Sequence, residues 1–263
     1  MASVEGARIN TPIAAYNALN ALNNVQRQLG VRQLRLATGK RINSVGDDPS
    51  GYTIAKQMEA RAGMMGAAVN NVGDAQTMLS TAEQALQTMR DLYTTIKEKQ
   101  VAASNPTSDQ SAIANDVNQL KSEIDDIIAH TNFNGKLLFN SSFSASYAVD
   151  DNGTALTVGF DASTATFGTV SSASVSTTSV DTAVGQVESA LQSIGSFIQR
   201  LSAKETNLNS SITNIKAAES RIYDADIAKE QLEASKLQIL QQTSVTQLAQ
   251  ANAGNQVFLT LFR

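Results

Sequence analysis

The sequence predicts a mainly α-helical protein, a long antiparallel helical bundle or coiled coil built from both chain ends, with a small β-hairpin region at its tip. Apolar residues recur at seven-residue spacing through long stretches of both halves, which is typical of helices that pack along their length. Aromatic residues make up only 5% of the chain, which favours packing through small and aliphatic side chains. Between the halves, a segment rich in Ser, Thr, Ala and Gly carries short alternations of apolar and polar residues, which indicate strands.

The first helix is expected from Pro12 to about Ala37. Proline suits the first helical position, where its missing N–H is not needed, and Thr11 before it can act as the N-cap. Gly39 ends the periodic stretch. The apolar stripe of this helix, which is predicted to enter a terminal coiled coil, contains Leu22, Val25 and Leu29.

The second helix is expected over residues 49–104, with Asp48 as its N-cap and Pro49 at its first position. Its apolar residues form two heptad rows. The first row contains Met58, Met65, Val72, Leu79, Leu86 and Tyr93, and the second contains Ile54, Ala68, Ala75, Ala82, Met89 and Ile96. Such a helix is about 80 Å long at 1.5 Å per residue, so it needs partner helices along its length.

A turn at Asn105-Pro106 separates this helix from a shorter one that is expected to fold back on it. Either Thr107 or Ser108 can cap the shorter helix, and its apolar residues between positions 113 and 127 step by four and three. The Asn134-Gly135 pair then signals a tight turn. Residues 140–181 are predicted to hold one or two β-hairpins, and a disordered linker is the alternative.

Heptads return over residues 184–222, interrupted at Glu205 and Glu219. A polar stretch near residues 217–226 precedes a last helix from about Ile227 to Ala251. The apolar residues of this helix that are assigned to the terminal coiled coil are Leu232, Leu237, Leu240 and Leu248.

These elements predict a three-part organisation in which the two chain ends pair. Residues 1–38 and 227–263 form the terminal helices, residues 39–139 and 181–226 form an outer helical bundle, and residues 140–180 form a short tip.

Composition excludes several classes of protein. With no cysteine and one histidine, a disulfide scaffold or a thiolate zinc site is excluded, and no metal or cofactor site is predicted. The net charge is −4 and charges of both signs are interspersed, which argues against nucleic-acid binding. The basic stretch from Arg32 to Arg41 is therefore interpreted as a solvated face or an interface with carboxylates. No apolar stretch is long enough to span a membrane, and the N-terminus does not resemble a cleaved signal peptide. Composition alone leaves open whether the protein is cytoplasmic or exported.

An enzyme is not predicted. Asp224 and Asp226 form an acidic pair, but general acid–base catalysis needs a proton partner and a cleft, and His130 is remote in sequence. We interpret the two aspartates as helix caps or partners of arginines.

Two motifs, one near each chain end, resemble those of the bacterial flagellins. The stretch "LATGKRINSVGDDPSGYTI" and the stretch "ESRIYDADIAKEQ" follow the family's end signatures, and "TNFNGKLLF" follows its T-x-F-N-G turn. The resemblance covers roughly residues 8–140 and 181–263. In the first stretch the matching residues are Gly39, Arg41, Ile42, Asn43, Asp47, Asp48, Gly51 and Ile54.

The resemblance implies a structural subunit that self-assembles into the flagellar filament for motility. It implies export without a cleaved signal peptide through the flagellar type III apparatus to an extracellular filament. The implied partners are further copies of the chain, an export chaperone, the filament cap and the hook-junction proteins. A hook–filament junction protein is the alternative, but such a protein is expected to diverge at "GDD" and "DADIAKEQ", which this chain retains.

The resemblance also identifies candidate residues for a joint between helical layers that contacts other subunits. These are Gly39, Arg41, Asn43, Asp47, Asp48, Gly51, Arg221, Asp224 and Asp226. We expect Asp47 and Asp48 to act both as helix caps and in assembly.

Two further expectations concern the surface. Flagellins that the vertebrate flagellin-sensing receptor recognises carry an arginine where this chain has Thr95 and a leucine where it has Lys99, so recognition is doubtful. The Ser and Thr residues within 141–180 are candidate glycosylation sites, and formal N-glycosylation triplets begin at Asn140, Asn152 and Asn209.

Overall fold

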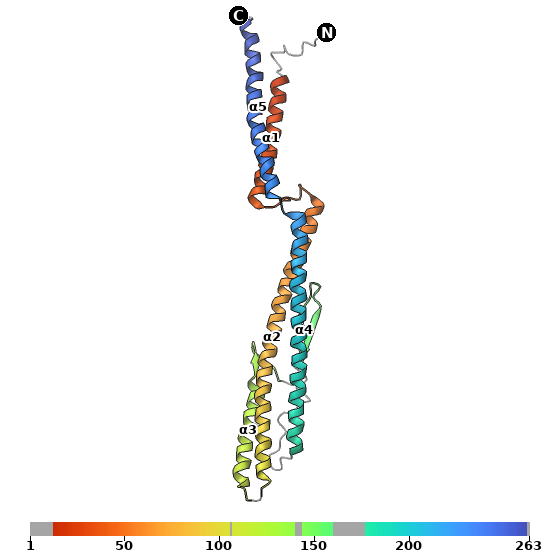
Figure 1. Ribbon diagram of the computed structural model, residues 1–263, viewed down its shortest axis with the longest axis vertical. Coiled ribbons are helices and arrows are strands. Elements are labelled where there is room, and N and C mark those ends of the chain that lie inside the picture. Colours follow the sequence, from red (N-terminus) through yellow and green to blue (C-terminus); the bar gives the residue numbers. More distant parts are fainter. Residues whose placement is uncertain (1–12, 106, 140–143, 160–176, 262–263) are drawn as a thin grey trace. The chain divides into compact units, whose positions relative to one another are not determined.

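The computed structural model describes residues 13–105, 107–139, 144–159 and 177–261, which form helices and short antiparallel hairpins (Figure 1). This confirms the predicted fold class. The helices are α1 (Ile13–Thr38), α2 (Pro49–Ala103), α3 (Gln110–His130), α4 (Thr177–Tyr223) and α5 (Ile227–Leu261). The strands are β1 (Asn132–Phe133), β2 (Lys136–Leu137), β3 (Ser144–Ala148) and β4 (Ala155–Gly159).

The chain divides into two compact units. Unit 1 comprises Met1–Glu59 and Lys216–Arg263, and unit 2 comprises Ala60–Ile215. The unit boundary lies within α2 and α4, whereas the sequence placed a boundary at residues 38 and 227. The three-part organisation into terminal helices, outer bundle and tip stays a prediction.

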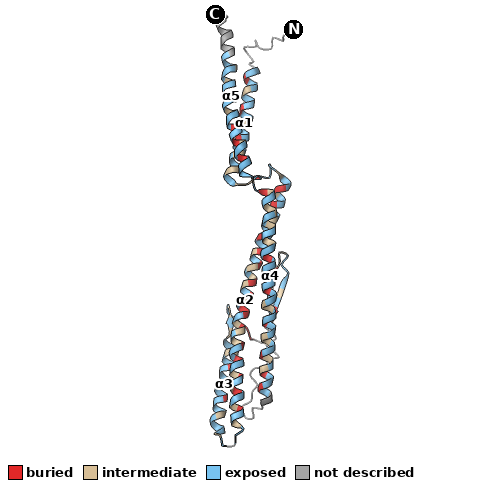
Figure 2. Cartoon of the chain, in the orientation of Figure 1, coloured by how far each residue is buried: buried red, intermediate tan, exposed pale blue. Residues whose placement is uncertain are grey.

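Unit 2 is built on the heptad rows of α2. From Met65 to Ile96 both rows are buried in one cluster with residues of α3 and α4, as the spacing predicted, and Figure 2 shows buried residues recurring along α2. In α4 the heptad positions Val187, Ile194, Leu201 and Leu208 are buried against the same cluster. Glu205 and Glu219 do not interrupt the helix.

The β3–β4 hairpin belongs to unit 2 and is anchored by charged side chains. Val149 and Val158 of the hairpin region are buried in the core of unit 2. The Asp151 carboxylate accepts hydrogen bonds from Nε and Nη2 of Arg61 at 2.9 and 2.6 Å. The described part of residues 140–181 contains one hairpin, and residues 140–143 and 160–176 lie outside the described residues.

Helix boundaries follow the predicted caps with one correction. Asp48 caps α2, because its Oδ1 accepts a hydrogen bond from the N–H of Gly51 at 2.9 Å. The cap of α3 is Asp109 rather than Thr107 or Ser108, since Asp109 Oδ1 accepts from the N–H groups of two following residues at 3.0 and 3.1 Å. Thr107 instead donates to Asn105 within the turn, and Ser108 donates to the carbonyl of a residue in α2. The predicted cap Thr11 and Pro12 lie outside the described residues.

Unit 1 contains the antiparallel pair of α1 and α5 and the segments that connect them to α2 and α4. Leu29, Ala234 and Leu237 form a small buried cluster between α1 and α5. A second cluster contains Ile42, Ala55 and Tyr223. Helix α5 runs to Leu261, ten residues beyond the predicted end. Among the described residues, no helix is long and apolar enough to cross a membrane.

Candidate assembly joint

The joint is the part of unit 1 formed by residues 39–51 and 221–226, where the two chain halves meet in a short antiparallel bridge. Lys40 pairs with Asp224. The N–H of Arg41 donates to the carbonyl of Tyr223 at 2.7 Å, and the N–H of Ala225 donates to the carbonyl of Gly39 at 2.9 Å. The bridge supplies a donor to the carbonyl of Tyr223, which lies in the last turn of α4 and has no partner within that helix.

Gly39 ends α1 in a left-handed conformation. Its φ is +69°, and its N–H donates to the carbonyl of Arg35 at 2.9 Å. Residues with a Cβ rarely adopt this backbone geometry, so glycine suits the position and allows the chain to reverse there.

Asp47 organises the loop between the bridge and α2. Its Oδ2 accepts hydrogen bonds from the N–H groups of Asn43 and Ser44 at 3.0 and 2.9 Å and from the Ser44 hydroxyl at 3.2 Å. The backbone N–H groups of Ser44 and Asn43 lower the pKa of Asp47 below its ordinary value of 3.8. Asn43 completes the loop, since its Nδ2 donates to the carbonyl of Lys40 at 2.9 Å.

Gly51 lies where a side chain would not fit. A Cβ at this position would meet Asp48 Oδ2 at 2.5 Å and Ile42 Cδ1 at 2.8 Å. Both neighbours are held, because Asp48 caps α2 and Ile42 is only 1% exposed. The glycine is therefore required by close packing at the start of α2 rather than by its φ.

The acidic pair Asp224 and Asp226, in the C-terminal segment of the joint, has structural roles. Asp226 caps α5, since its Oδ1 accepts from the N–H of Lys229 at 3.2 Å. Asp224 takes part in the bridge through its backbone. Arg221 is exposed in the last turn of α4, whereas the Arg41 guanidinium donates to the carbonyl of Ile222 at 2.7 Å.

Sequence analysis did not identify the aromatic side chains that hold the joint. Lys40 Nζ lies 4.6 Å from the centre of the Tyr223 ring. The centres of the Tyr223 and Tyr52 rings are 6.4 Å apart. A cation over an aromatic face is attracted by the ring quadrupole. The sequence carries one signal for them, a tyrosine within each of the two end motifs.

The predicted coiled-coil residues separate into buried and exposed sets. Leu22, Leu29 and Leu237 are buried, and Val25 and Leu248 are half-buried. Leu232 is 66% exposed and Leu240 is 41% exposed, so neither lies in the seam between α1 and α5 of one chain. A heptad pattern cannot reveal this, because α5 is apolar on more than one face.

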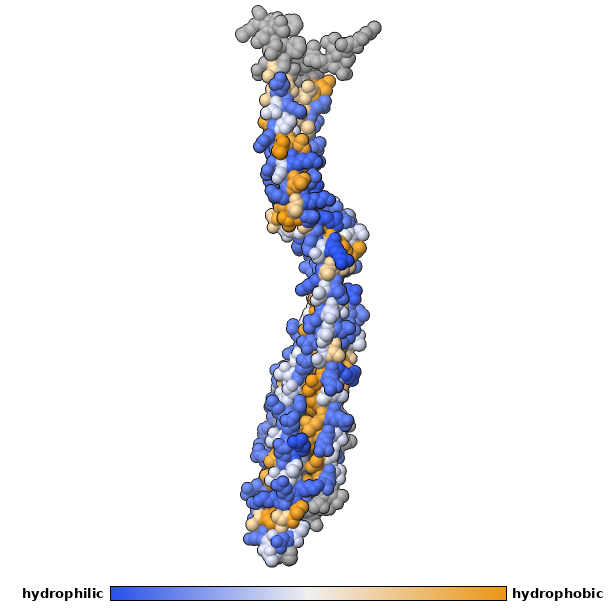
Figure 3. Space-filling model, in the orientation of Figure 1, coloured by the Kyte–Doolittle hydropathy of each residue, from blue (hydrophilic) through white to orange (hydrophobic). Residues whose placement is uncertain are grey.

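Other exposed apolar side chains are concentrated in the same unit. In the described part of the chain, every exposed large hydrophobic residue except Met64, Val101 and Leu137 belongs to unit 1. Figure 3 shows apolar residues at the surface of α1 and α5. Those on the two helices are Ile13, Tyr16, Leu19, Val31, Leu34, Ile227, Leu232, Ile239, Leu240 and Val245.

The remaining surface candidates lie in unit 2. Lys99 Nζ forms an ion pair with Asp116 of α3 at 2.7 Å, and the Thr95 hydroxyl donates to the carbonyl of Asp91 at 3.0 Å. Asn152 is exposed in the β3–β4 turn. The Asn140 triplet and most of the Ser and Thr residues within 141–180 fall outside the described residues.

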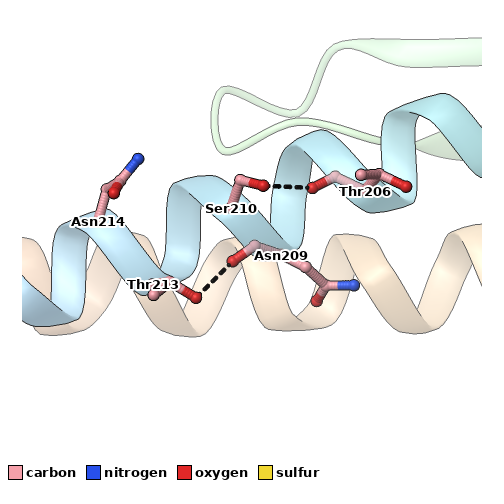
Figure 4. Close-up of a pocket in the computed structure, with 5 residues that line it drawn as sticks. All are labelled: Thr206, Asn209, Ser210, Thr213 and Asn214. Carbon is pink, nitrogen blue, oxygen red and sulfur yellow. Dashed lines mark hydrogen bonds between the residues drawn. The ribbon is translucent and has the colours of Figure 1, made fainter.

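The third N-glycosylation triplet lies in an open polar depression on α4 (Figure 4). The hydroxyls of Ser210 and Thr213 donate to the carbonyls of Thr206 and Asn209, each at 2.9 Å. Both hydroxyls therefore donate to carbonyl groups of α4 itself. Asn214 also lines the depression. The depression has the character of a solvated helix face.

Comparison with known proteins matches both ends of the chain to one family. Residues 9–144 match the bacterial flagellin N-terminal helical region, and residues 177–262 match the bacterial flagellin C-terminal helical region. Flagellin FljM of Caulobacter vibrioides is 31% identical over 97% of this chain and 98% of its own length. Flagellin FlaB1 of Treponema pallidum is 29% identical over 97% of this chain and 99% of its own length. The crystal structure of Bacillus cereus flagellin is 23% identical, with a TM-score of 0.41, over 56% of this chain and 88% of its own. The chain belongs to the bacterial flagellins, the structural subunits of the flagellar filament.

Proposed function

We propose that this flagellin polymerises by burying the exposed apolar faces of α1 and α5 against other copies of the chain. The observation that carries the proposal is the concentration of exposed apolar side chains in unit 1. Leu232 and Ile239 are 66% and 64% exposed, which is unusual for large aliphatic residues on a paired helix. Full burial of a large aliphatic side chain is worth roughly 1.5–3 kcal/mol, so burying the exposed two-thirds of each of these contributes roughly 1–2 kcal/mol, and the exposed residues of α1 and α5 together can offset the cost of association.

The joint would present a fixed contact surface to neighbouring subunits. Its backbone is held by the bridge to residues 222–225 and by the Asp47 loop, so its exposed side chains have defined positions. Arg221, Asp224 and Val45 are exposed there and are the candidates for contact with other copies. Rigid presentation lowers the entropy cost of association.

The layered arrangement of the filament follows from the family resemblance. Residues 1–38 and 227–263 would form the inner tube, and residues 39–139 and 181–226 the next layer outward. Residues 140–180 occupy the place where other flagellins carry outer domains, so we expect a thin and smooth filament.

Further partners and the export route also rest on the resemblance. We expect an export chaperone to cover α5 before secretion, and the filament cap and hook-junction proteins to contact the growing and basal ends. Export through the flagellar type III apparatus, without a cleaved signal peptide, would deliver the subunit to the extracellular filament. The family is structural, and we propose no catalytic role for the aspartates of the joint.

Recognition by the vertebrate flagellin-sensing receptor is expected to be weak. Lys99 is engaged by Asp116, and a threonine at position 95 lacks the planar donor set of an arginine. A reporter-cell assay with purified monomer measures this directly, and full activation at low concentration would refute it.

Seeded growth tests the proposal. Purified monomer is added to short filament seeds, and filament length is followed by negative-stain electron microscopy. Long filaments are expected. Caps that stop growth on the seeds would favour the hook–filament junction alternative, and monomer that leaves the seeds unchanged would contradict polymerisation.

A further inference from the structure

An ionic cluster lies between α1 and α5 within unit 1, in which the carboxylate of Glu230 is buried and the side chains of Arg32 and Arg35 are half-buried. Glu230 in the first turn of α5 is 6% exposed, although it carries a charge. Arg32 Nη1 donates to both of its carboxylate oxygens at 3.0 and 2.8 Å. Arg35 Nη1 donates to Oε1 at 3.4 Å. Two arginines of one helix therefore hold one carboxylate of the other.

Apolar contacts alone define the pairing of α1 and α5 poorly. The buried cluster beside the ionic contact contains only Leu29, Ala234 and Leu237, with Val25 and Leu36 packed against it. Helix α5 is also apolar on faces that point away from α1, where Leu232 and Ile239 are exposed. A helix with apolar residues on several faces can pair in more than one rotation or register.

The ionic cluster distinguishes between these arrangements. A carboxylate that is buried without its partners is strongly unfavourable, and the half-buried guanidinium groups would lose their acceptor. Leu237 lies seven residues after Glu230, so a shift by one heptad would place an aliphatic side chain against both arginines. The shifted pairing keeps apolar contacts but loses every charge-assisted hydrogen bond of the cluster.

We infer that Glu230, Arg32 and Arg35 are positioning residues that fix the register and the facing side of α5 against α1. The cluster would select which apolar residues of α5 remain exposed, and so which face meets the next subunit. The inference rests on the proposed polymerisation through α1 and α5, and it assigns specificity rather than affinity to the charges.

The test measures register directly inside assembled filaments. The chain has no cysteine, so the substitutions Gln28→Cys and Gln238→Cys, at exposed positions of α1 and α5, provide the only labelling sites for nitroxide spin labels. Filaments are grown with about one labelled subunit in twenty, and the intramolecular distance distribution is measured by pulsed electron paramagnetic resonance. Growth of the labelled parent filaments is the prerequisite, and its failure would count against the proposed polymerisation rather than against the register inference.

The decisive variant combines Arg32→Met, Glu230→Leu and Arg35→Met, which replaces the cluster with apolar side chains of similar size. We expect filaments to grow and the single distance of the parent to split, with a second population at the distance that a slide of α5 along its axis by about 5 Å for one turn, or about 10 Å for one heptad, produces between the two labels. Glu233→Gln is the matched control, because Glu233 lies one turn away on α5 and, among the described residues, forms an ion pair only with Lys236 of the same helix, at 3.8 Å. The control should keep the distance of the parent.

Two results would overturn the inference. An unchanged single distance in the triple variant would show that apolar packing sets the register without the charges. Absence of filament growth in the triple variant would show that the cluster is needed for pairing itself, because apolar replacement of a buried ion cluster is otherwise tolerated.

Discussion

The N–H of Arg41 donates a hydrogen bond to the carbonyl of Tyr223 at 2.7 Å, which joins the two end motifs of the chain in one backbone bridge. The polar stretch that separates the first two helices therefore forms one side of the joint, and the stretch around the end of α4 forms the other. Around this bridge, Asp47 shapes a loop, Asp48 caps α2 and Asp226 caps α5.

Substitution of Gly51 by alanine should destabilise the start of α2. The added Cβ would press on the Asp48 carboxylate and on Ile42, and crowding in a packed site costs about 1–3 kcal/mol. The free energy of unfolding of the monomer, measured by urea titration with circular dichroism, checks this. Gly46→Ala is the control, because the nearest neighbour of its Cβ is Ser44 Oγ at an ordinary 3.6 Å. Equal stability of the two variants would contradict the packing argument.

Asp47→Asn should make the melting temperature depend less on pH in the acid range. Because backbone N–H groups lower the pKa of the folded carboxyl, the charged form stabilises the folded state above the ordinary value of 3.8. That contribution is lost as the pH falls through the lower folded pKa. Melting temperatures of the parent and the variant should therefore differ at neutral pH and converge below pH 3.8. Parallel curves across this range would mean that the loop does not depend on the Asp47 charge.

Tyr93→Phe should leave unit 2 as stable or make it more stable by about 1 kcal/mol. The Tyr93 hydroxyl is buried and makes no hydrogen bond to the described residues, and burial raises the pKa of Tyr93. Removal of an unsatisfied buried hydroxyl relieves a desolvation cost. Tyr147→Phe provides the contrast, since the Tyr147 hydroxyl donates to Met78 Sδ at 3.3 Å. Thermal unfolding of both variants measures the difference, and a clear loss of stability in Tyr93→Phe would point to a partner for its hydroxyl.

Much of the fold was predictable because heptad spacing reports burial along a continuous helix. The rows of α2 from Met65 to Ile96 are buried as the spacing predicted, and the β3–β4 hairpin lies in the segment with alternating residues. Ile54 was placed in a buried row but is 41% exposed, because the start of α2 packs in the joint through Ala55. Local hydrogen bonds decided the cap at Asp109, which periodicity does not report.

The candidate site was less accessible from sequence. The end motifs located the joint, but the partners that hold it come from opposite ends of the chain. Nothing in the local sequence indicates that Tyr223 lies under Lys40. An interface with carboxylates was one interpretation of the basic stretch that begins at Arg32, but the sequence did not identify Glu230 as the partner. The exposure of Leu232 and Leu240 also depends on which face of α5 meets α1, and an apolar pattern on several faces leaves that choice open.

If exposed apolar side chains of unit 1 drive polymerisation, the critical concentration for seeded growth depends on them. Leu232→Ser combined with Ile239→Ser removes two exposed apolar side chains of α5, and Val101→Ser removes one of similar exposure, 62%, in unit 2. We expect the double variant to raise the critical concentration by roughly five- to thirtyfold for each side chain, because each is about two-thirds exposed and loses roughly 1–2 kcal/mol of burial. The Val101→Ser control should grow filaments like the parent. An unchanged critical concentration in the double variant, or a large increase in the control alone, would contradict the account.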